Sequence, residues 1–309
     1  MKTRIAEIIR QHSSFEIITH EGPDEDAVGS SRALALGLIH LGKSVKLIYP
    51  SPIPESLQFT PAPKTKRISS PEVSLLLDVS DISMIAGVNP RGMVVVIDHH
   101  KTNNGFGEFF WIDPSKSSTS EMVYELCMEL GIEITSAIAS NLYLGLFGDT
   151  GGFVHANTTP DVFRVAYALT LAGAEPNSIA NKLRKTRSLT FFHLLCTVME
   201  RIFFQDGICA GYIRFSDMIR AHARPDDTSG IIDEMASLAG ADLVILLKEL
   251  DPDTVHCSLR SRNGESALRT ARAFGGGGHA MAAGFTVKGR AEEIIGDVIE
   301  EGERWIEKE

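Results

Sequence analysis

Histidine and aspartate residues gather in short segments of the first half of the chain. His20, Asp24 and Asp26 lie in HEGPDEDAVGS, a segment whose Gly and Pro residues argue against a helix over its first residues. Imidazole and carboxylate groups of this kind suit Mn²⁺, Mg²⁺ or Zn²⁺. An acidic surface turn in which an aspartate caps the next helix is the alternative interpretation. This segment therefore indicates a metal site only in combination with others.

Two more segments supply such side chains. Asp98, His99 and His100 directly follow the apolar run MVVVI, so a carboxylate and two imidazoles leave a buried strand together. One histidine at such a place is usually a core residue, but that explains two neighbouring histidines poorly. Asp78 lies in VSLLLDV, and Asp149 follows an apolar helical run in GLFGDTGGF. A helix C-terminus disfavours a carboxylate unless a bound cation reverses the effect, and a solvated loop acid is the alternative for this position.

The segments that must position these side chains have an α/β pattern. Four apolar runs predict buried parallel strands, at residues 15–19, 44–49, 73–79 and 93–98. Two stretches with helical spacing that end at glycine predict crossover helices, at residues 29–43 and 117–131. Three of the four strands carry polar groups at their carboxyl ends, where open parallel sheets bind ligands. We expect a doubly wound, mainly parallel sheet with the site at that edge.

The second half of the chain predicts a smaller α/β domain. Its expected elements are strands at 208–215, 242–250 and 254–261, a helix around 229–240, and an acidic amphipathic helix over the last twenty residues. We place the domains at 1–180 and 199–309, joined by a helical connector at 181–198. The connector region concentrates basic charge, in Lys182, Arg184, Lys185 and Arg187. Such a cluster is usually a solvated face.

A glycine run lies near the end of the second half. Gly275 to Gly278 precede His279, and four consecutive glycines permit close approach of the backbone to a ligand. A flexible loop is the alternative. Arg260 and Arg262 alternate on one face at the end of a predicted strand. These residues are candidates for binding an anionic substrate.

Composition limits the classes of function. The 309 residues include 30 Lys and Arg against 40 Asp and Glu, a net charge of −10, which argues against a protein that coats duplex DNA. Four cysteines without a CxxC pair predict free thiols in a reducing compartment. No run approaches the roughly 18 apolar residues of a membrane span, and no secretory signal is evident. We therefore expect a soluble cytoplasmic protein with no membrane partner.

Five motifs occur in order along the chain: HxxxDxD, LLLDVSD, IDHH, GDTGGF and GGGGHAMAAG. With them the chain resembles the DHH/DHHA1 phosphoesterase family, and most closely its bifunctional oligoribonuclease and pAp phosphatase branch. The resemblance implies an N-terminal DHH domain, a C-terminal DHHA1 domain and a catalytic cleft between them. It also implies two divalent ions, Mn²⁺ in first place, with Mg²⁺ or Co²⁺ as alternatives.

The resemblance further implies a role for each candidate residue. One ion would be held by His20, Asp24 and Asp78, and the second by Asp26, Asp78, His99 and Asp149, with Asp78 bridging. His100 would contact the scissile phosphate, and Asp98 would orient the neighbouring imidazoles. Substrate would be bound from the second domain by Arg260, Arg262, Gly276, Gly277, Gly278 and His279.

These features lead us to expect an enzyme that hydrolyses phosphoester bonds. It would release mononucleotides from short single-stranded oligonucleotides and convert pAp to AMP, with a water activated between two metal ions. Alternatives are a c-di-AMP or pApA phosphodiesterase, a longer single-strand exonuclease, a family II pyrophosphatase and a catalytically silent nucleotide-binding regulator. An aromatic content of 7% disfavours the exonuclease, because few rings are available for stacking. The glycine-rich second domain disfavours the pyrophosphatase, and the complete ligand set disfavours the silent regulator. A homodimer is a further expectation for the partners of the chain.

Overall fold

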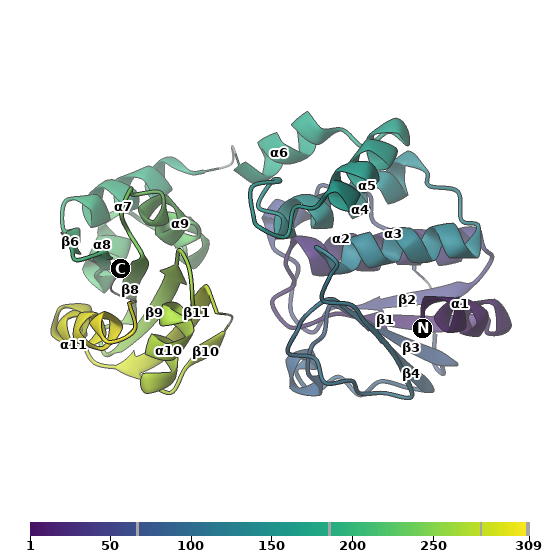
Figure 1. Cartoon of the computed structure of the whole chain (residues 1–309), viewed down its shortest axis with the longest axis horizontal. Helices are drawn as coiled ribbons and strands as arrows, with labels where there is room; N and C mark the ends of the chain where they lie inside the picture. The colour runs from purple at the N-terminus through teal and green to yellow at the C-terminus, as the bar shows by residue number, and fades with distance from the viewer. Residues whose placement is uncertain (66–67, 185–186, 279, 307–309) are drawn as a thin grey trace. The chain divides into compact units, whose positions relative to one another are not determined.

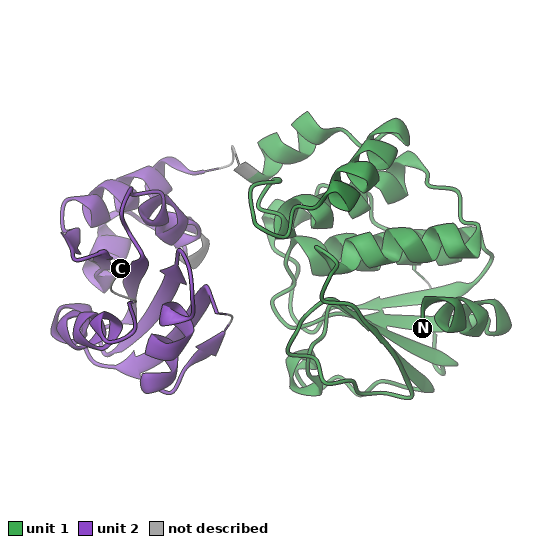
Figure 2. Ribbon diagram, viewed as in Figure 1, with its two compact units in different colours: residues 1–186 green, residues 187–309 purple. Residues whose placement is uncertain are grey.

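A computed structural model describes residues 1–65, 68–184, 187–278 and 280–306 (Figure 1). The chain divides into two compact units, Met1–Thr186 and Arg187–Glu309 (Figure 2), each of which is described by itself below. The segment predicted as a helical connector, 181–198, covers the end of α6 (Pro176–Arg184) and most of α7 (Leu189–Met199). Two helices therefore occupy this part of the chain, and they belong to different units.

Unit 1 contains a five-stranded sheet of order β2-β1-β3-β4-β5 in which every described pairing is parallel. The strands are β1 (Ser14–Ile18), β2 (Ser44–Ile48), β3 (Val73–Leu77), β4 (Met93–Asp98) and β5 (Phe109–Ile112). The parallel α/β fold expected for the first half is confirmed, and the first four strands lie within two residues of the predicted runs. The strand β5, which has only four residues, was not predicted from the sequence.

The two faces of this sheet are covered differently. Side chains such as Leu75 and Val95 pack with the α-helices in one apolar core. The helices are α1 (Lys2–Gln11), α2 (Glu25–His40), α3 (Thr119–Leu130), α4 (Ser136–Asp149) and α5 (Pro160–Leu171). The alternate side chains Leu76 and Val96 pack on the other face with Ile85 of the 3-10 helix η2 (Ile82–Ile85). The α-helices thus gather on one face, while η2 and loop residues cover the other.

Glycines allow α2 and α4 to approach closely. A Cβ at Gly29 of α2 would lie 2.4 Å from the carbonyl oxygen of Asn141, and a Cβ at Gly145 of α4 would lie 2.5 Å from Asp26 Oδ1. Real Cβ atoms do not come this near to such groups. The helix contact therefore needs glycine at both positions, and it brings Asp26 beside α4.

Unit 2 is built on a mixed six-stranded sheet of order β10-β11-β9-β8-β7-β6. The strands are β6 (Phe203–Gln205), β7 (Ile208–Ile213), β8 (Leu243–Asp251), β9 (Thr254–Ser261), β10 (Gly277–Gly278) and β11 (Ala282–Lys288). Among the described residues of this unit, four α-helices follow α7, namely α8 (Phe215–Arg220), α9 (Ile231–Ala236), α10 (Ser266–Ala273) and α11 (Ala291–Glu303), with the 3-10 helix η3 (Pro225–Thr228) between α8 and α9. The smaller C-terminal α/β domain is confirmed, and the acidic helix expected over the last twenty residues is present as α11, which covers 13 of them.

Two other expectations concern cysteines and membranes. All four cysteines are free, and only Cys196 is exposed, whereas the other three are buried. Among the described residues, every helix is too short or too polar to cross a bilayer.

Candidate metal centre and substrate site

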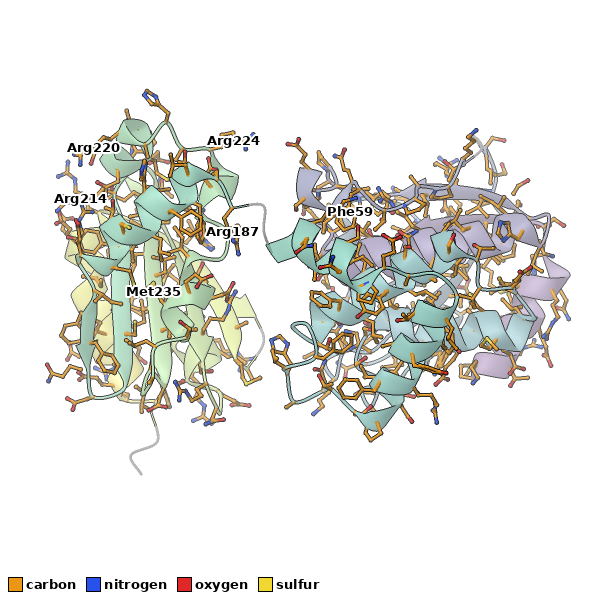
Figure 3. The ribbon with its side chains drawn as sticks, turned by 90° about the horizontal axis from the view of Figure 1, so that it is seen from above. Phe59, Arg187, Arg214, Arg220, Arg224 and Met235 are labelled. Atoms are coloured by element: carbon orange, nitrogen blue, oxygen red, sulfur yellow. The ribbon has the colours of Figure 1, made fainter. Side chains whose placement is uncertain are left out.

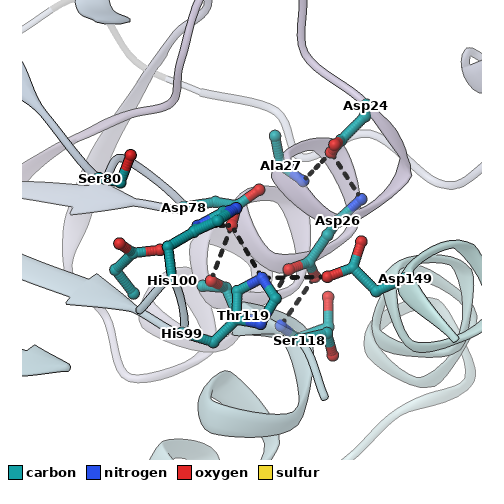
Figure 4. Close-up of polar contacts among 12 residues, drawn as sticks. Asp24, Asp26, Ala27, Asp78, Ser80, His99, His100, Ser118, Thr119 and Asp149 are labelled. Atoms are coloured by element: carbon teal, nitrogen blue, oxygen red, sulfur yellow. Dashed lines mark hydrogen bonds and ion pairs between the residues drawn. The ribbon is translucent and has the colours of Figure 1, made fainter. Parts of the chain in front are cut away.

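The predicted metal ligands converge at the carboxyl ends of β1, β3 and β4, beside the N-terminus of α2 and the C-terminus of α4 (Figure 4). Their potential ligand atoms form three groups, and within each group all atoms lie within 4.8 Å of one another. The groups are His20 with Asp24 and Asp78, Asp26 with His99 and Asp149, and Asp78 with His99 and His100. Two of them share Asp78, which lies at the junction of the cluster.

The two carboxylate oxygens of Asp78 point to different histidines. Oδ2 lies 3.5 Å from Nε2 of His20, and Oδ1 lies 3.7 Å from Nε2 of His99. His20 Nε2 is also 3.7 Å from Asp24 Oδ1, and His99 Nε2 is 3.1 Å from Asp149 Oδ2. One carboxylate between two separate imidazole–carboxylate pairs is the arrangement that a bridging ligand requires.

Asp78 has an unusual backbone conformation. It follows the last residue of β3 with φ of +62°, in the left-handed region that non-glycine residues rarely occupy. Its side chain is 2% exposed, and Thr119 Oγ1 donates a hydrogen bond to its Oδ1 at 3.1 Å. Strain of this kind persists where the surroundings hold it, and it is concentrated at functional sites.

Asp26 is completely buried and is held by the start of α3. The backbone N–H of Thr119 donates to its Oδ2 at 2.6 Å, and that of Ser120 donates to its Oδ1 at 2.8 Å. Burial and the nearby charges of Asp149 and Asp78 still raise its pKa well above the ordinary value. Asp26 is thus fixed in position, but its negative charge is not fully compensated by its surroundings.

Asp24 combines the two interpretations considered for its segment. Its Oδ1 caps α2 by accepting hydrogen bonds from the N–H groups of Asp26 and Ala27, each at 3.0 Å. The same oxygen faces His20. Capping and a place beside an imidazole are therefore compatible at this residue.

The electrostatics of the cluster favour cations. Burial raises the pKa of Asp149 to about 7, although its hydrogen bond with His99 opposes the change. Burial alone would lower the pKa of His99, but Asp149 and the charge of Asp78 raise it to about 10. His20 behaves alike: burial would lower its pKa, but Asp24 and Asp78 raise it to about 11. Apart from the exposed Asp24, this is a largely buried set of carboxylate oxygens, which repel one another, and imidazole nitrogens, and such a set fits divalent metal ions.

His100 is oriented by a buried carboxylate. Asp98, fully buried at the end of β4, lies 2.7 Å from His100 Nδ1 and accepts a second hydrogen bond from Asn103 Nδ2 at 2.7 Å. Burial would lower the pKa of His100, but the hydrogen bond to Asp98 raises it. With Nδ1 bound in this way, a phosphate contact by His100 would be made through Nε2.

Several supporting residues were missed by the sequence analysis. Thr119 and Ser120 hold Asp26 and Asp78, and Asn103 holds Asp98. Asn157 Nδ2 donates to the carbonyl oxygen of Asp149 at 3.2 Å. A signal existed for the first two, because a helix start was predicted at this segment, and helix N-termini bind carboxylates.

In unit 2 three of the predicted substrate-binding residues lie on strands of the same sheet. Gly277 and Gly278 of β10 pair with β11, which pairs in turn with β9, the strand that carries Arg260. Gly276 has steric grounds to be glycine, because a Cβ there would lie 2.2 Å from the carbonyl oxygen of Gly284. His279 lies outside the described residues.

Both predicted arginines of unit 2 have contacts within that unit. Arg260 Nε donates to Asp233 at 3.1 Å. Arg262, just beyond β9, donates from Nε to the carbonyl oxygen of Ala241 at 3.1 Å and from Nη2 to that of Leu238 at 3.0 Å. The guanidinium of Arg262 therefore also holds the segment that follows α9.

The basic residues of the predicted connector are divided between the units. Lys182 lies over the ring of Phe59 in unit 1, 4.8 Å from its centroid. Arg187 lies over the ring of Phe191 in unit 2, at 4.6 Å, and donates to the carbonyl oxygen of Ser229 (Figure 3). The side chain of Arg184 and the whole of Lys185 lie outside the part of the chain that the structure describes.

Comparison with known proteins identifies the class. Residues 14–146 match the DHH family, N-terminal domain, and residues 207–308 match the DHHA1 domain. The chain is 36% identical over 293 residues to the bifunctional oligoribonuclease and PAP phosphatase NrnA of Thermus thermophilus, covering 92% of this chain and 88% of that protein. The chain therefore belongs to the DHH family, in the form that carries a C-terminal DHHA1 domain.

Other relatives agree with this assignment. The protein of the same name from Bacillus subtilis is 26% identical over 309 residues, covering 96% of this chain and 97% of that one. Among solved structures, an exopolyphosphatase-related protein from Bacteroides fragilis has a TM-score of 0.92 at 24% identity, covering 98% of this chain and 96% of the other. RecJ of Thermus thermophilus in complex with Mn²⁺ has a TM-score of 0.59 at 14% identity, covering 98% and 54%. The structures support the fold.

Proposed function

We propose that the protein is a divalent-metal-dependent phosphoesterase that hydrolyses short oligoribonucleotides to mononucleotides and removes the 3′-phosphate of PAP. The observation that carries the chemistry is Asp78, whose two oxygens face His20 and His99 in separate ligand groups. The names of the two NrnA relatives support the substrate class.

The residues then take the following roles. The first ion would be held by His20, Asp24 and Asp78, and the second by Asp26, Asp78, His99 and Asp149. When bound, such ions would supply two kinds of chemistry, acidification of the attacking water and neutralisation of charge on the phosphate oxygens. His100, oriented by Asp98, binds a non-bridging oxygen of the scissile phosphate. The hydrogen bonds from the start of α3 keep Asp26 in position while substrate binds.

The decisive experiment is a substrate panel with the full-length protein. Labelled RNA of two to five nucleotides, PAP, pApA, c-di-AMP and pyrophosphate are compared in Mn²⁺, with Asp78→Asn as the inactive control. We expect mononucleotide release from the short RNAs and AMP from PAP. Faster hydrolysis of pApA or c-di-AMP than of any RNA would favour a dinucleotide phosphodiesterase, and hydrolysis of pyrophosphate alone would contradict the proposal.

We propose Mn²⁺ as the working ion. Oxygen and imidazole ligands together suit Mn²⁺, whereas Mg²⁺ prefers oxygen ligands and retained waters. Turnover after chelation and reconstitution with Mn²⁺, Co²⁺ or Mg²⁺ tests this. Higher turnover with Mg²⁺ at matched occupancy would contradict it.

Substrate recognition by unit 2 is part of the proposal. Arg260, Arg262 and the backbone of Gly276, Gly277 and Gly278, with His279, would bind the end of the oligonucleotide and so favour short substrates. The test is kcat/KM of Arg262→Ala on RNAs of 2, 5 and 20 nucleotides at fixed salt. We expect the largest loss on the dinucleotide. An equal loss at all lengths would mean that Arg262 does not contribute to the preference for short substrates. Its role would then be structural, through its hydrogen bonds to Ala241 and Leu238.

We also propose a homodimer formed through α5. Phe163, Tyr167 and Leu171 recur every fourth residue and are 55%, 67% and 72% exposed. A two-fold axis at Tyr167 would place Phe163 against Leu171 of the partner subunit. Light scattering should show a dimer that Tyr167→Glu dissociates and Met128→Glu, a change at another exposed apolar residue, does not. A monomeric wild type would exclude it.

A cytoplasmic location is the remaining proposal. It follows from the four free thiols, because oxidising compartments favour disulfides. Fractionation of the source cells tests it, and recovery with the extracellular fraction would contradict it.

A further inference from the structure

Arg32 is a buried cation without a carboxylate partner. It lies on α2, two turns beyond the metal-binding segment, and is 5% exposed. Its Nη1 donates to the carbonyl oxygens of Leu57 and Thr60, at 3.2 and 3.1 Å, and to the Thr60 hydroxyl at 2.8 Å. No described acidic side chain forms a salt bridge with it. Because buried charges are usually paired, this guanidinium has unused capacity for an anion.

An open cavity of about 720 Å³ lies against this arginine. Its lining combines Arg32 with the polar groups of Tyr49, Ser51 and Gln58 and with proline, isoleucine and alanine side chains. No Asp or Glu is among the described lining residues, so Arg32 supplies their only formal charge. In a chain with net charge −10 this is a local exception. A cation beside apolar and aromatic walls suits an organic anion.

The walls of the cavity are held by specific contacts. Tyr49 Oη lies 2.8 Å from Ser31 Oγ. Next to the lining residue Ala62, Asn141 Nδ2 donates to the carbonyl oxygen of Pro61 at 2.9 Å, and Arg32 donates to the carbonyl oxygen of Thr60. Arg32 thus both holds the segment of Leu57 and Thr60 in place and lines the open cavity beside it.

The cavity adjoins the metal-binding segment. Ile18 of β1 pairs with Ile48 of β2, and the N–H of Thr19 donates to the carbonyl oxygen of Ile48 at 3.4 Å, so the two strands end at the same edge of the sheet. Ser51 Oγ also accepts a hydrogen bond from the N–H of Gly22, at 2.6 Å. Ser51 therefore connects the lining directly to the loop between His20 and Asp24.

We propose that this cavity is a second phosphate-binding site, in which Arg32 binds the phosphate of a nucleotide and the apolar wall receives its nucleoside. That the ligand is a nucleotide rests on the proposed function, whereas the anion site rests on Arg32 and the cavity alone. The phosphate comes either from the substrate strand beyond the scissile bond or from a free nucleotide.

The test is calorimetric titration of the full-length protein in EDTA, where no hydrolysis occurs, with AMP, inorganic phosphate and adenosine as probes. We expect AMP to bind and Arg32→Gln to weaken it about ten- to a hundredfold, the range for one charge-assisted contact. Arg4→Gln, which removes an exposed arginine of unit 1, should leave affinity unchanged. Because Arg32→Gln could loosen the wall, Gln58→Glu is the second variant: it adds an opposing charge at an exposed lining residue and should also weaken AMP.

Each outcome decides the proposal. Loss of AMP affinity in Gln58→Glu and in folded Arg32→Gln supports it; no AMP binding, or binding unchanged in both variants, overturns it. Hydrolysis assays in Mn²⁺ identify the source: a larger loss of kcat/KM on a trinucleotide than on a dinucleotide indicates the substrate strand, and an equal effect indicates a free nucleotide. Because the titration needs no turnover, an inactive protein that still binds AMP through Arg32 would contradict the proposed function and leave this site standing.

Discussion

Replacement of Asp78 separates its carboxylate from its backbone strain. Asp78→Asn, Asp78→Ala and Asp78→Gly all remove the charge that faces both His20 and His99. Changes that affect only the orientation of metal ligands cost about 10- to 100-fold in affinity or activity. Loss of a shared ligand should exceed this. We expect all three variants to bind fewer than two Mn²⁺ per chain and to lose more than about a hundredfold in turnover.

The same variants should differ in stability. With φ at +62°, an L-residue at position 78 carries a cost of about 1–2 kcal/mol that glycine avoids. Glycine also loses more entropy on folding, which offsets part of this gain. The unfolding free energy of Asp78→Gly should therefore exceed that of Asp78→Ala by about 1 kcal/mol. In a unit of the size of Met1–Thr186 this corresponds to about 2–4 °C in Tm.

Calorimetric Mn²⁺ titration, turnover on a dinucleotide and thermal unfolding in EDTA measure these effects. Asp81→Asn, a change at an exposed acid just beyond the site, is the matched control and should keep full metal stoichiometry. Two bound Mn²⁺ with near wild-type turnover in Asp78→Asn would refute the bridging assignment. Equal stability of the Ala and Gly variants would refute the strain argument.

Three other predictions follow from the contacts described. His99→Ala should weaken Mn²⁺ binding, whereas His100→Ala should keep metal stoichiometry and lose turnover; equal metal loss in both would contradict their separate roles. With a thiol reagent at neutral pH, Cys196 should react quickly, and the three buried thiols, whose pKa burial raises, only on unfolding. Burial would raise the pKa of Asp217, but hydrogen bonds from Arg201 and the backbone outweigh this and lower it. The contribution of Asp217 to stability is therefore present above about pH 4 and is lost as the pH falls below that. Acid unfolding of Asp217→Asn monitored by circular dichroism should start from a lower stability and depend less on pH in that range.

The parallel sheet could be predicted because its central strands β1, β3 and β4 are largely buried on both faces. Runs such as MVVVI are then continuous in hydrophobicity, and the carboxyl edge of the sheet follows from their order. The edge strand β5 carries no such signal: it has four residues, and Phe110 is 41% exposed. Its assignment depends on pairing with β4, which local sequence does not encode.

The ligand residues could be predicted for the same reason, since Asp78 and His99 follow directly from strand ends. Their supporting contacts could not. Asn103 reaches back to Asp98 from a loop, and the left-handed backbone of Asp78 has no counterpart in residue type, since Asp is only moderately common there. Arg32 gave no signal either, because an arginine within a helical pattern is usually exposed.

The position of Asp26 depends on packing contacts that the identities of the ligand residues alone do not reveal. Its carboxylate accepts hydrogen bonds from the start of α3, more than 90 residues along the chain, and lies beside α4 only because residue 145 has no side chain. A methyl group there would meet Ser120 Oγ at 2.1 Å as well as Asp26. Gly145 adds nothing to the helical pattern of apolar residues, and its intrinsic propensity disfavours a helix. The second ligand group therefore depends on a residue without functional atoms, whose importance only the packing of α2 against α4 reveals.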